Sequence, residues 1–320
     1  MKFSVIIPVF NRSEELRELL QSLTNQSHHD FEVVVIEDGS AIDSSEIVEE
    51  FKSRLQIQYL IQANTGQGFA RNNGMKIAQG DFFVILDSDV ILPVDYLQKL
   101  SSAITIRKLD AFGGPDAASQ DFSALQKAMD FAMTSFWTTG GIRGKMKDPS
   151  KYQARGFNMG VSRKVFEQTG GFVDPNQGED IEWSIRIKKA GFILELVQEA
   201  FVYHKRKNTI SSFSKQAFSF GRNRVNVSRF HPGAIKLVHW LPTAFSLFSL
   251  SILFSYFLNN TLFQISVGIF LLWSIAVILS SSSQNHSIKV GALSWVTSVL
   301  QLWSYGVGLP FELLKKASKG

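Results

Sequence analysis

Apolar, strand-like stretches alternate with helix-like stretches through the first 86 residues, and this alternation constrains the fold most. The strand-like runs are short and densely apolar, and they cover residues 3–9, 31–36, 57–61 and 81–86. Helix-like runs follow the first three of them, beginning near Ser13 and covering residues 43–54 and 67–78. Strands that alternate with helices through short turns form a parallel sheet with right-handed crossovers. The sequence therefore predicts an α/β fold with a mostly parallel sheet.

Polar residues gather where these strands end. The clusters are Pro8–Arg12, Glu37–Ser40 and Asp87–Asp89. Sheets of this kind bind ligands at the carboxyl ends of their strands. Gly66-Gln67-Gly68 lacks the third glycine of a dinucleotide fingerprint, and no Walker lysine follows a glycine loop. A transferred group attached to a nucleoside diphosphate is the ligand that fits best.

Asp87 and Asp89 directly follow the apolar run Phe82–Leu86. Because successive strand side chains point to opposite faces, we expect both carboxylates on one side and Ser88 on the other. Two such carboxylates offer oxygen ligands to Mg²⁺ or Mn²⁺, which neutralises a diphosphate. A solvated turn after the strand is the other explanation of this short pattern.

A second carboxylate pair, Glu179 and Asp180, opens an expected helix that ends near Gly191. Acids complement the dipole of a helix at its start, so capping alone would explain the pair. The functional alternative is a general base, since transfer of a sugar to a hydroxyl requires removal of its proton. Upstream, the stretch 154–161 carries small residues where another group is expected to approach the backbone closely.

Taken in order and spacing, these motifs resemble those of the family 2 glycosyltransferases over residues 1 to about 205. The matching residues are Val5–Asn11, Glu37–Ser40, Asn64, Gly66, Ala70–Asn72, Gly74, Ala78, Gly80, Asp87–Asp89 and Gly178–Asp180. The resemblance implies a GT-A fold, the nucleotide-sugar-binding domain of these enzymes. It also implies a DxD motif in which Asp87 and Asp89 hold the metal and the diphosphate.

The same resemblance suggests roles for other residues. Asp180 would be the catalytic base of an inverting single displacement, with Glu179 beside it. The nucleotide-sugar-binding set would comprise Pro8, Asn11, Asp38, Asn64, Arg71, Asn72 and Asp87, with Asp38 at the base. Arg71 and Asn72 could instead be ordinary polar residues of a helix surface. His204 either completes the metal shell or is a solvated strand end.

Gln216-Ala217-Phe218-Ser219 does not supply the Gln-x-x-Arg-Trp motif of processive members, so transfer of one sugar at a time is expected. The expected activity is metal-dependent transfer from a nucleotide sugar, a UDP-sugar by expectation, to a lipid-linked or membrane-proximal acceptor. The alternatives are a nucleotidyltransferase, which would need a basic phosphate loop that is not visible, and an inactive membrane scaffold. The sugar, the acceptor and the oligomeric state remain open.

The second half of the chain indicates a membrane. Leu237–Leu258 is an uncharged run of 22 residues, long enough for a hydrocarbon layer of roughly 30 Å. Uncharged runs also cover about 262–280 and 290–311. We expect three membrane helices. If the third segment is instead interfacial or re-entrant, Lys315, Lys316 and Lys319 stay on the cytoplasmic side, as cationic residues tend to do.

Charge also divides the chain. After Glu199 the only acidic residue is Glu312, so the net charge of +5 arises from the second half and does not indicate nucleic-acid binding. Residues 206–236 are basic and aromatic, which fits an amphipathic segment on an anionic membrane surface. The basic residues could be simple flanking charge, or they could also bind the phosphate of a lipid acceptor. The expected domains are a cytosolic catalytic domain (1–205), this juxtamembrane segment and a membrane domain (237–320). The expected location is the inner (cytoplasmic) membrane, with several crossings.

Overall fold

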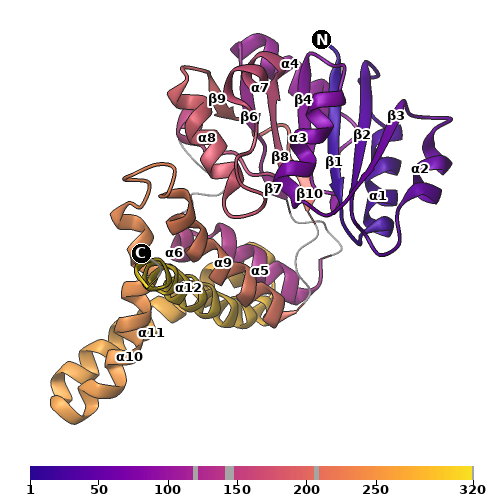
Figure 1. Ribbon diagram of the computed structural model, residues 1–320. Helices are drawn as coiled ribbons and strands as arrows, with labels where there is room; N and C mark the ends of the chain where they lie inside the picture. Colours follow the sequence, from indigo (N-terminus) through magenta and orange to yellow (C-terminus); the bar gives the residue numbers. More distant parts are fainter. Residues whose placement is uncertain (118–121, 141–147, 205–208, 319–320) are drawn as a thin grey trace. The chain divides into compact units, whose positions relative to one another are not determined.

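A computed structural model describes residues 1–117, 122–140, 148–204 and 209–318 (Figure 1). The chain forms two compact units. The first consists of Met1–Ser119 and Met146–Lys205, and the second of Gln120–Lys145 and Arg206–Gly320. The second unit therefore includes a segment that the sequence assigned to the catalytic domain.

The first unit is built on a seven-stranded sheet in the order β3-β2-β1-β4-β8-β6-β9. Its strands are β1 (Phe3–Val9), β2 (Phe31–Asp38), β3 (Ile57–Gln62), β4 (Phe82–Leu86), β6 (Ala111–Gly113), β8 (Asn158–Ser162) and β9 (Leu194–Leu196). All of these pairings are parallel except those of β8, which runs antiparallel to β4 and β6. The predicted mostly parallel sheet is confirmed.

A small sheet of three short strands accompanies the large one, in the order β5 (Val90–Ile91), β10 (Val202–His204) and β7 (Asp116–Ala117). The sequence indicated β10 but not β5, β6, β7 or β9. The four missed strands have only two or three residues, too few to show the period of two by which strands are recognised, whereas β10 follows directly on the apolar residues Ala200 and Phe201. A short η1 helix (Pro149–Lys151) precedes β8.

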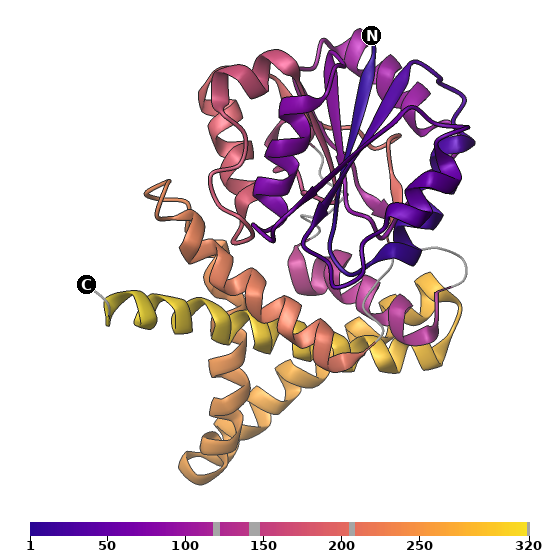
Figure 2. The same cartoon turned by 45° about the vertical axis from the view of Figure 1, so that its right-hand side comes forward.

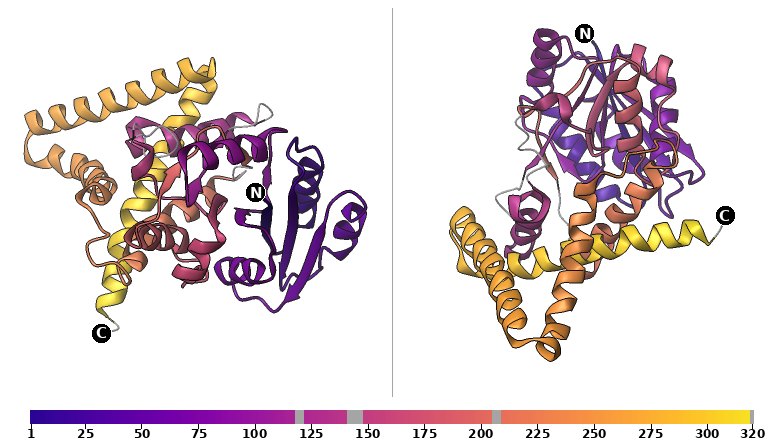
Figure 3. Two further views of the ribbon diagram at one scale, coloured as in Figure 1. Left: turned by 90° about the horizontal axis from the view of Figure 1, so that it is seen from above. Right: turned by 90° about the vertical axis from the view of Figure 1, so that its left-hand side faces the viewer.

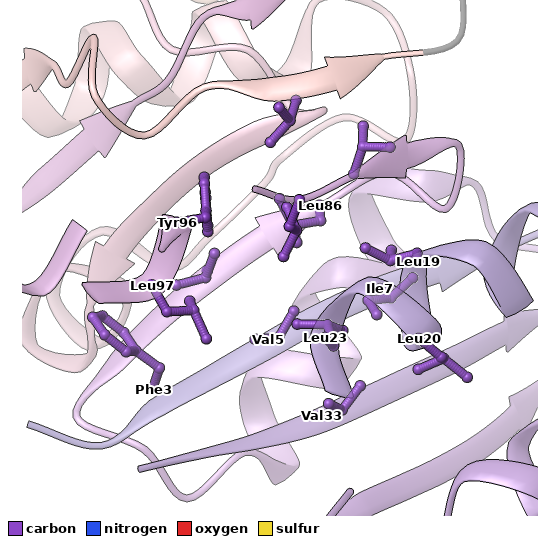
Figure 4. Packing of buried hydrophobic residues seen from close by; sticks show 14 of the residues in the cluster. Phe3, Val5, Ile7, Leu19, Leu20, Leu23, Val33, Leu86, Tyr96 and Leu97 are labelled. Carbon is purple, nitrogen blue, oxygen red and sulfur yellow. The ribbon is translucent and has the colours of Figure 1, made fainter. Parts of the chain in front are cut away.

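Helices cover both faces of the large sheet (Figure 2). One face packs against α1 (Ser13–Thr24), α2 (Ser45–Phe51) and α4 (Tyr96–Arg107), and the other against α3 (Gln67–Ile77), α7 (Arg163–Thr169) and α8 (Glu179–Lys189). Alternation along β1 sends Val5 and Ile7 into the first core and Ile6 into the second. Figure 4 shows Val5 and Ile7 packed with leucines of α1. Burial on both faces explains the continuous apolar runs of these strands.

The second unit is helical. It contains α5 (Ala124–Thr134), α6 (Phe136–Thr139), α9 (Ile210–Val227), η2 (Leu237–Trp240), α10 (Leu241–Leu258), α11 (Asn260–Asn285) and α12 (Ile288–Ala317). Helix α12 packs along α9 and α5. At the crossing of α9 and α12, a Cβ on Gly221 would collide with the Tyr305 carbonyl, and one on Gly308 with the Phe218 carbonyl. Glycine at these two positions lets the two backbones approach closely.

Two helical stretches of the described chain are long and apolar enough to cross a membrane, namely Leu237–Leu258 and Asn260–Asn285. They form a hairpin (Figure 3). Its turn is fixed by Asn259, because the side chain of this residue accepts a hydrogen bond of 3.0 Å from the Leu262 amide. Helix α12, which contains the third expected span, is not among these stretches.

The expected boundary between domains differs from the observed units for a physical reason. Met129 and Met133 of α5 pack against Phe213 of α9, and Thr297 Oγ1 of α12 donates to the Ala128 carbonyl at 2.9 Å. Residues 122–140 therefore belong with the C-terminal helices. Phe213 was expected on a membrane surface, but it is buried in this protein core.

Candidate active site

The polar groups at the carboxyl edge of the sheet come together as parallel strands require. Strand β1 lies between β2 and β4 in parallel register. The residues that follow β1, β2 and β4 therefore meet at one edge of the sheet. Arg12 follows β1 and forms a salt bridge with Asp89, which follows β4.

The two acids of the DxD motif have different partners. Asp87 Oδ1 accepts a hydrogen bond of 2.6 Å from Arg71 Nη2, whereas Asp89 pairs with Arg12. The Asp87 side chain is 30% exposed and that of Asp89 11% exposed. Residues 88–89 form a turn between β4 and β5, so the strand alternation from which we expected the shared orientation does not continue through the motif.

Arg71 is the buried centre of the site. Its side chain is 1% exposed, and Nη1 reaches Glu179 Oε1 at 3.2 Å while Nη2 holds Asp87. A Cβ on Gly156 would lie 2.6 Å from Arg71 Nη1, so a larger residue there would displace the guanidinium from its contacts with Asp87 and Glu179. This is the close approach expected in the stretch 154–161. The alternative that Arg71 is an ordinary surface charge is excluded.

Helix α3 also fixes the loop that leads to the second acid pair. The Asn72 side chain donates to the Phe172 carbonyl at 2.7 Å and accepts from the Phe172 amide at 2.9 Å. The Gly68 amide donates to the Pro175 carbonyl at 2.7 Å. Asn72, expected near the nucleotide, thus uses its amide to hold the loop before α8.

Glu179 and Asp180 have unequal environments. Glu179 is buried and its Oε1 accepts from Gln67 Nε2 at 2.7 Å in addition to Arg71. Burial, followed by the charge of Asp180, raises the pKa of Glu179 to about 7 although the Arg71 charge opposes the shift. Asp180 is half-buried, and its two oxygens accept from the amides of Gly156 at 3.2 Å and Ile181 at 2.7 Å.

Helix capping does not account for this pair. The N-cap position of α8 is Gly178, with φ of 85°, and it makes no side-chain capping hydrogen bond. Both acids lie in the first turn, where they complement the helix dipole. Their specific partners on α3 and at Gly156 go beyond that general effect.

The expected base-binding residue Asp38 lies at the end of β2 with both oxygens engaged. Oδ1 accepts from the Thr65 amide at 2.8 Å and from Gln62 Nε2 at 2.8 Å, and Oδ2 from the Gly66 amide at 2.9 Å. Asp38 thereby fixes the loop before α3. Asn64, in the same loop, is exposed.

On the neighbouring loop, Asn11 has a left-handed backbone with φ of 54°. Its Oδ1 accepts from the Ala41 amide at 2.9 Å, and its own amide donates to Ser40 Oγ at 2.7 Å. These contacts connect the ends of β1 and β2. Pro8 lies half-buried within β1.

The remaining expected metal ligand is His204. The register of β10 places its backbone opposite Val90, the residue after Asp89, but its side chain lies outside the described part of the structure. Among the residues whose placement is described, no group of three or more His, Asp or Glu could hold a metal ion.

Sequence reasoning missed Arg12, Gln67 and Gly156. Arg12 belongs to the polar cluster expected after β1, so its position gave a signal. Gln67 lies four residues before Arg71, on the same face of α3. Gly156 gave only the general signal of small residues, because its partner is 85 residues away in sequence.

The parallel sheet, with its acids at the carboxyl edge and the antiparallel β8 beside β4, defines the GT-A class of glycosyltransferase folds. The model of the family "Glycosyl transferase family 2" matches residues 4–170, just over half of the chain. The chain belongs to this family and is a glycosyltransferase.

Curated relatives agree. Hyaluronan synthase of Pasteurella multocida is 26% identical over 63% of this chain and 24% of its own length. Glycosyltransferase AglE of Haloferax volcanii is 26% identical over 70% of this chain and 73% of its own length. An uncharacterized glycosyltransferase of Rickettsia bellii is 46% identical, but over 28% of this chain and 13% of its own length. The chain thus spans only a minor part of several relatives.

Solved structures share the fold. A mannosyltransferase of Pyrobaculum calidifontis, PcManGT, described in complex with GDP-Man and Mn²⁺, aligns with a TM-score of 0.63 at 15% identity, covering 93% of this chain and 87% of that one. TarS residues 1–349 of S. aureus align with a TM-score of 0.53 at 18% identity, covering 93% and 90%.

Proposed function

We propose that this protein is a membrane-anchored, metal-dependent, inverting glycosyltransferase. It would transfer one sugar from a nucleoside diphosphate sugar to a lipid-linked or membrane-proximal acceptor. The observation that supports this most directly is the double contact of Arg71, which joins Asp87 at the diphosphate side to the acid pair at the start of α8. The residues that would serve the leaving diphosphate and those that would serve the attacking hydroxyl thus belong to one network of salt bridges.

The donor set fits a hard cation. Asp87 and Asp89 offer carboxylate oxygens, and Mg²⁺ or Mn²⁺ in such sites is commonly bound by one or two carboxylates together with substrate phosphates. Asp87, Asp89 and Asp180 with Arg12 and Arg71 give a negative balance even when Glu179 is protonated, so the protein alone does not neutralise a diphosphate. The cation would supply that positive charge as the diphosphate leaves. PcManGT, which shares the fold, is described with Mn²⁺.

The base is best assigned to Asp180. Its carboxylate is half-buried and held by the amides of Gly156 and Ile181, so it is oriented while still accessible. It would take the proton of the acceptor hydroxyl as that oxygen attacks the anomeric carbon from the side opposite the diphosphate. Glu179 is buried and held by Gln67 and Arg71, so it would position the first turn of α8 rather than meet the acceptor.

The membrane anchor would be the α10–α11 hairpin. Only 11% and 17% of its two apolar windows are buried within the protein, whereas a core helix of a soluble domain is mostly buried. Leu253 and Leu272, for example, are 67% and 70% exposed. Lipid would cover these side chains.

The decisive experiment is a nucleotide-sugar panel on the purified full-length protein in detergent. At a hundred times its dissociation constant, the true donor stabilises by about 2.7 kcal/mol, and this thermal shift should require Mn²⁺ or Mg²⁺ and vanish with EDTA. A UDP-sugar is the expected hit. Release of a nucleoside diphosphate identifies a glycosyltransferase, whereas release of pyrophosphate from a triphosphate would identify a nucleotidyltransferase. A panel without any shift or turnover would favour an inactive scaffold.

A further inference from the structure

Helix α12 buries many polar side chains, beside the apolar Val290, Leu302 and Leu309, and exposes apolar ones. Its protein-facing side is rich in polar residues, namely Ser294, Thr297, Ser298, Gln301 and Glu312, all of them buried. The opposite stripe is apolar and half-buried or exposed, and it follows helical spacing through Val296, Leu300, Trp303, Val307, Phe311 and Leu314, of which Phe311 also packs its ring against Phe218 of α9. Val307, Phe311 and Leu314 are 46%, 48% and 72% exposed. A stripe of this kind matches a lipid environment better than water.

Both halves of α12 are fixed to residues that precede the membrane hairpin. In the first half, Thr297 Oγ1 donates to the Ala128 carbonyl of α5 at 2.9 Å. Near the other end, Glu312 accepts from Arg222 Nε at 2.6 Å and from Arg229 Nη2 at 3.3 Å. With a rise of 1.5 Å per residue, about 22 Å of helix separate these anchors. A helix that crossed the membrane would carry one of them to the side opposite α5 and α9.

Helix α12 also contacts the two ends of the hairpin that lie on the entry side. Thr243 Oγ1, at the start of α10, donates to the Gly306 carbonyl at 2.8 Å, and a Cβ on Gly306 would collide with the Pro242 carbonyl. A Cβ on Gly291 would collide with Ser282, near the end of α11. The glycines of α12 thus allow it to lie across the base of the hairpin, where the chain enters and leaves.

We propose that α12 is an interfacial helix that lies in the headgroup boundary of the membrane, with its apolar stripe toward the acyl chains. The chain then crosses twice, through α10 and α11, and both ends of α12 remain on the side of α9. Lys315 and Lys316 lie at headgroup level, where a lipid surface with anionic headgroups attracts them. The inference rests on the proposed anchoring by the hairpin.

The protein contains no cysteine, so each introduced cysteine is the only one. We would label Ser53→Cys, Asn260→Cys and Ser318→Cys with a membrane-impermeant maleimide in sealed vesicles of known orientation. Ser53 and Ser318 should react from one side and Asn260 from the other. If Ser318→Cys reacts from the same side as Asn260→Cys, the interfacial assignment of α12 is overturned, while the proposed anchoring by the hairpin still holds. If all three react from one side, the hairpin does not cross, and the proposed anchor fails as well.

Depth measurements distinguish a flat helix from a tilted or buried one. Nitroxide labels on Leu300→Cys, Val307→Cys and Leu314→Cys should show the same shallow depth by collision with oxygen and with a water-soluble nickel complex. Depth that increases steadily from one label to the next would contradict an interfacial helix. Equal, water-like exposure at all three positions would also overturn the proposal, because lipid would not cover the stripe.

Discussion

Arg71 and Asp87 form a salt bridge of 2.6 Å although Arg71 is 1% exposed and Asp87 is 30% exposed. The carboxylate of Asp87, at the carboxyl edge of the sheet, is thus oriented by the buried guanidinium of Arg71. Since the same guanidinium contacts Glu179, helix α3 couples the end of β4 to the start of α8.

Replacement of this cation should be costly. Arg71→Met leaves Asp87 and Glu179 without their buried partner, and loss of one member of a buried pair destabilises by about 3–5 kcal/mol. Urea unfolding of the catalytic unit, detected by its susceptibility to limited proteolysis, measures the loss of stability. Arg17→Met is the matched control, because its pairs with Glu14 and Glu50 lie at the surface, and its midpoint should not change. Equal midpoints for the two variants would contradict the central role of Arg71.

The metal assignment is tested at Asp89. Asp89→Asn keeps the shape of the side chain but removes its charge, and we expect donor affinity in Mn²⁺ to fall at least about tenfold, the scale of lost metal-site interactions. Donor titrations with and without Mn²⁺ measure this. Asp95→Asn, which changes only an i,i+4 pair with Lys99, is the control. A variant that retains full metal-dependent affinity would exclude Asp89 as a ligand.

The base is tested by Asp180→Asn. The amide can still accept hydrogen bonds from Gly156 and Ile181 but cannot take a proton, so turnover should fall by roughly 10² to 10⁴ with donor affinity nearly unchanged. Glu179→Gln, measured in the same transfer assay, should reduce turnover less. The reverse order would assign the base to Glu179.

The raised pKa of Glu179 predicts a pH dependence of stability. The ordinary pKa of this carboxyl is 4.5 and its pKa in the folded protein is about 7. Between pH 4.5 and pH 7 the folded state therefore keeps the proton that the unfolded state has lost. The associated stability is complete below pH 4.5 and is lost as the pH rises through 7, with about 3 kcal/mol as an upper bound. Glu179→Gln cannot ionise. In thermal unfolding without donor, its melting temperature relative to the parent should therefore rise from pH 5 to pH 8, and a constant difference would contradict the shift.

The parallel sheet could be predicted because β1, β2 and β4 carry long apolar runs with helices between them. The antiparallel β8 and the paired short strands depend on contacts between distant segments, which a single sequence does not show. Helix α9 was missed for a related reason. Its basic residues indicated a membrane surface, while its buried face, including Phe213 and Ala217, packs against other helices.

At the site, the sequence identified the acids but not their partners. Strand alternation predicted a common orientation for Asp87 and Asp89. Because the chain turns after β4, Asp87 instead pairs with Arg71 and Asp89 with Arg12. The burial of Arg71 follows from Gly156, whose role becomes visible only in three dimensions. The sequence could predict that these acids lie near one edge of the sheet, but not which arginine pairs with which acid.

The contact between α5 and α12 affects how the protein is made. Thr297 and Ala128 are 169 residues apart, so at 5–20 residues per second α5 leaves the ribosome roughly 8–34 s before its partner is synthesised. In that interval the membrane hairpin is also synthesised. Met129 and Met133 gain their neighbour Phe213 once α9 is made, but the side of α5 that meets α12 stays uncovered on the nascent chain until α12 appears, and a chaperone or the lipid surface would have to shield it.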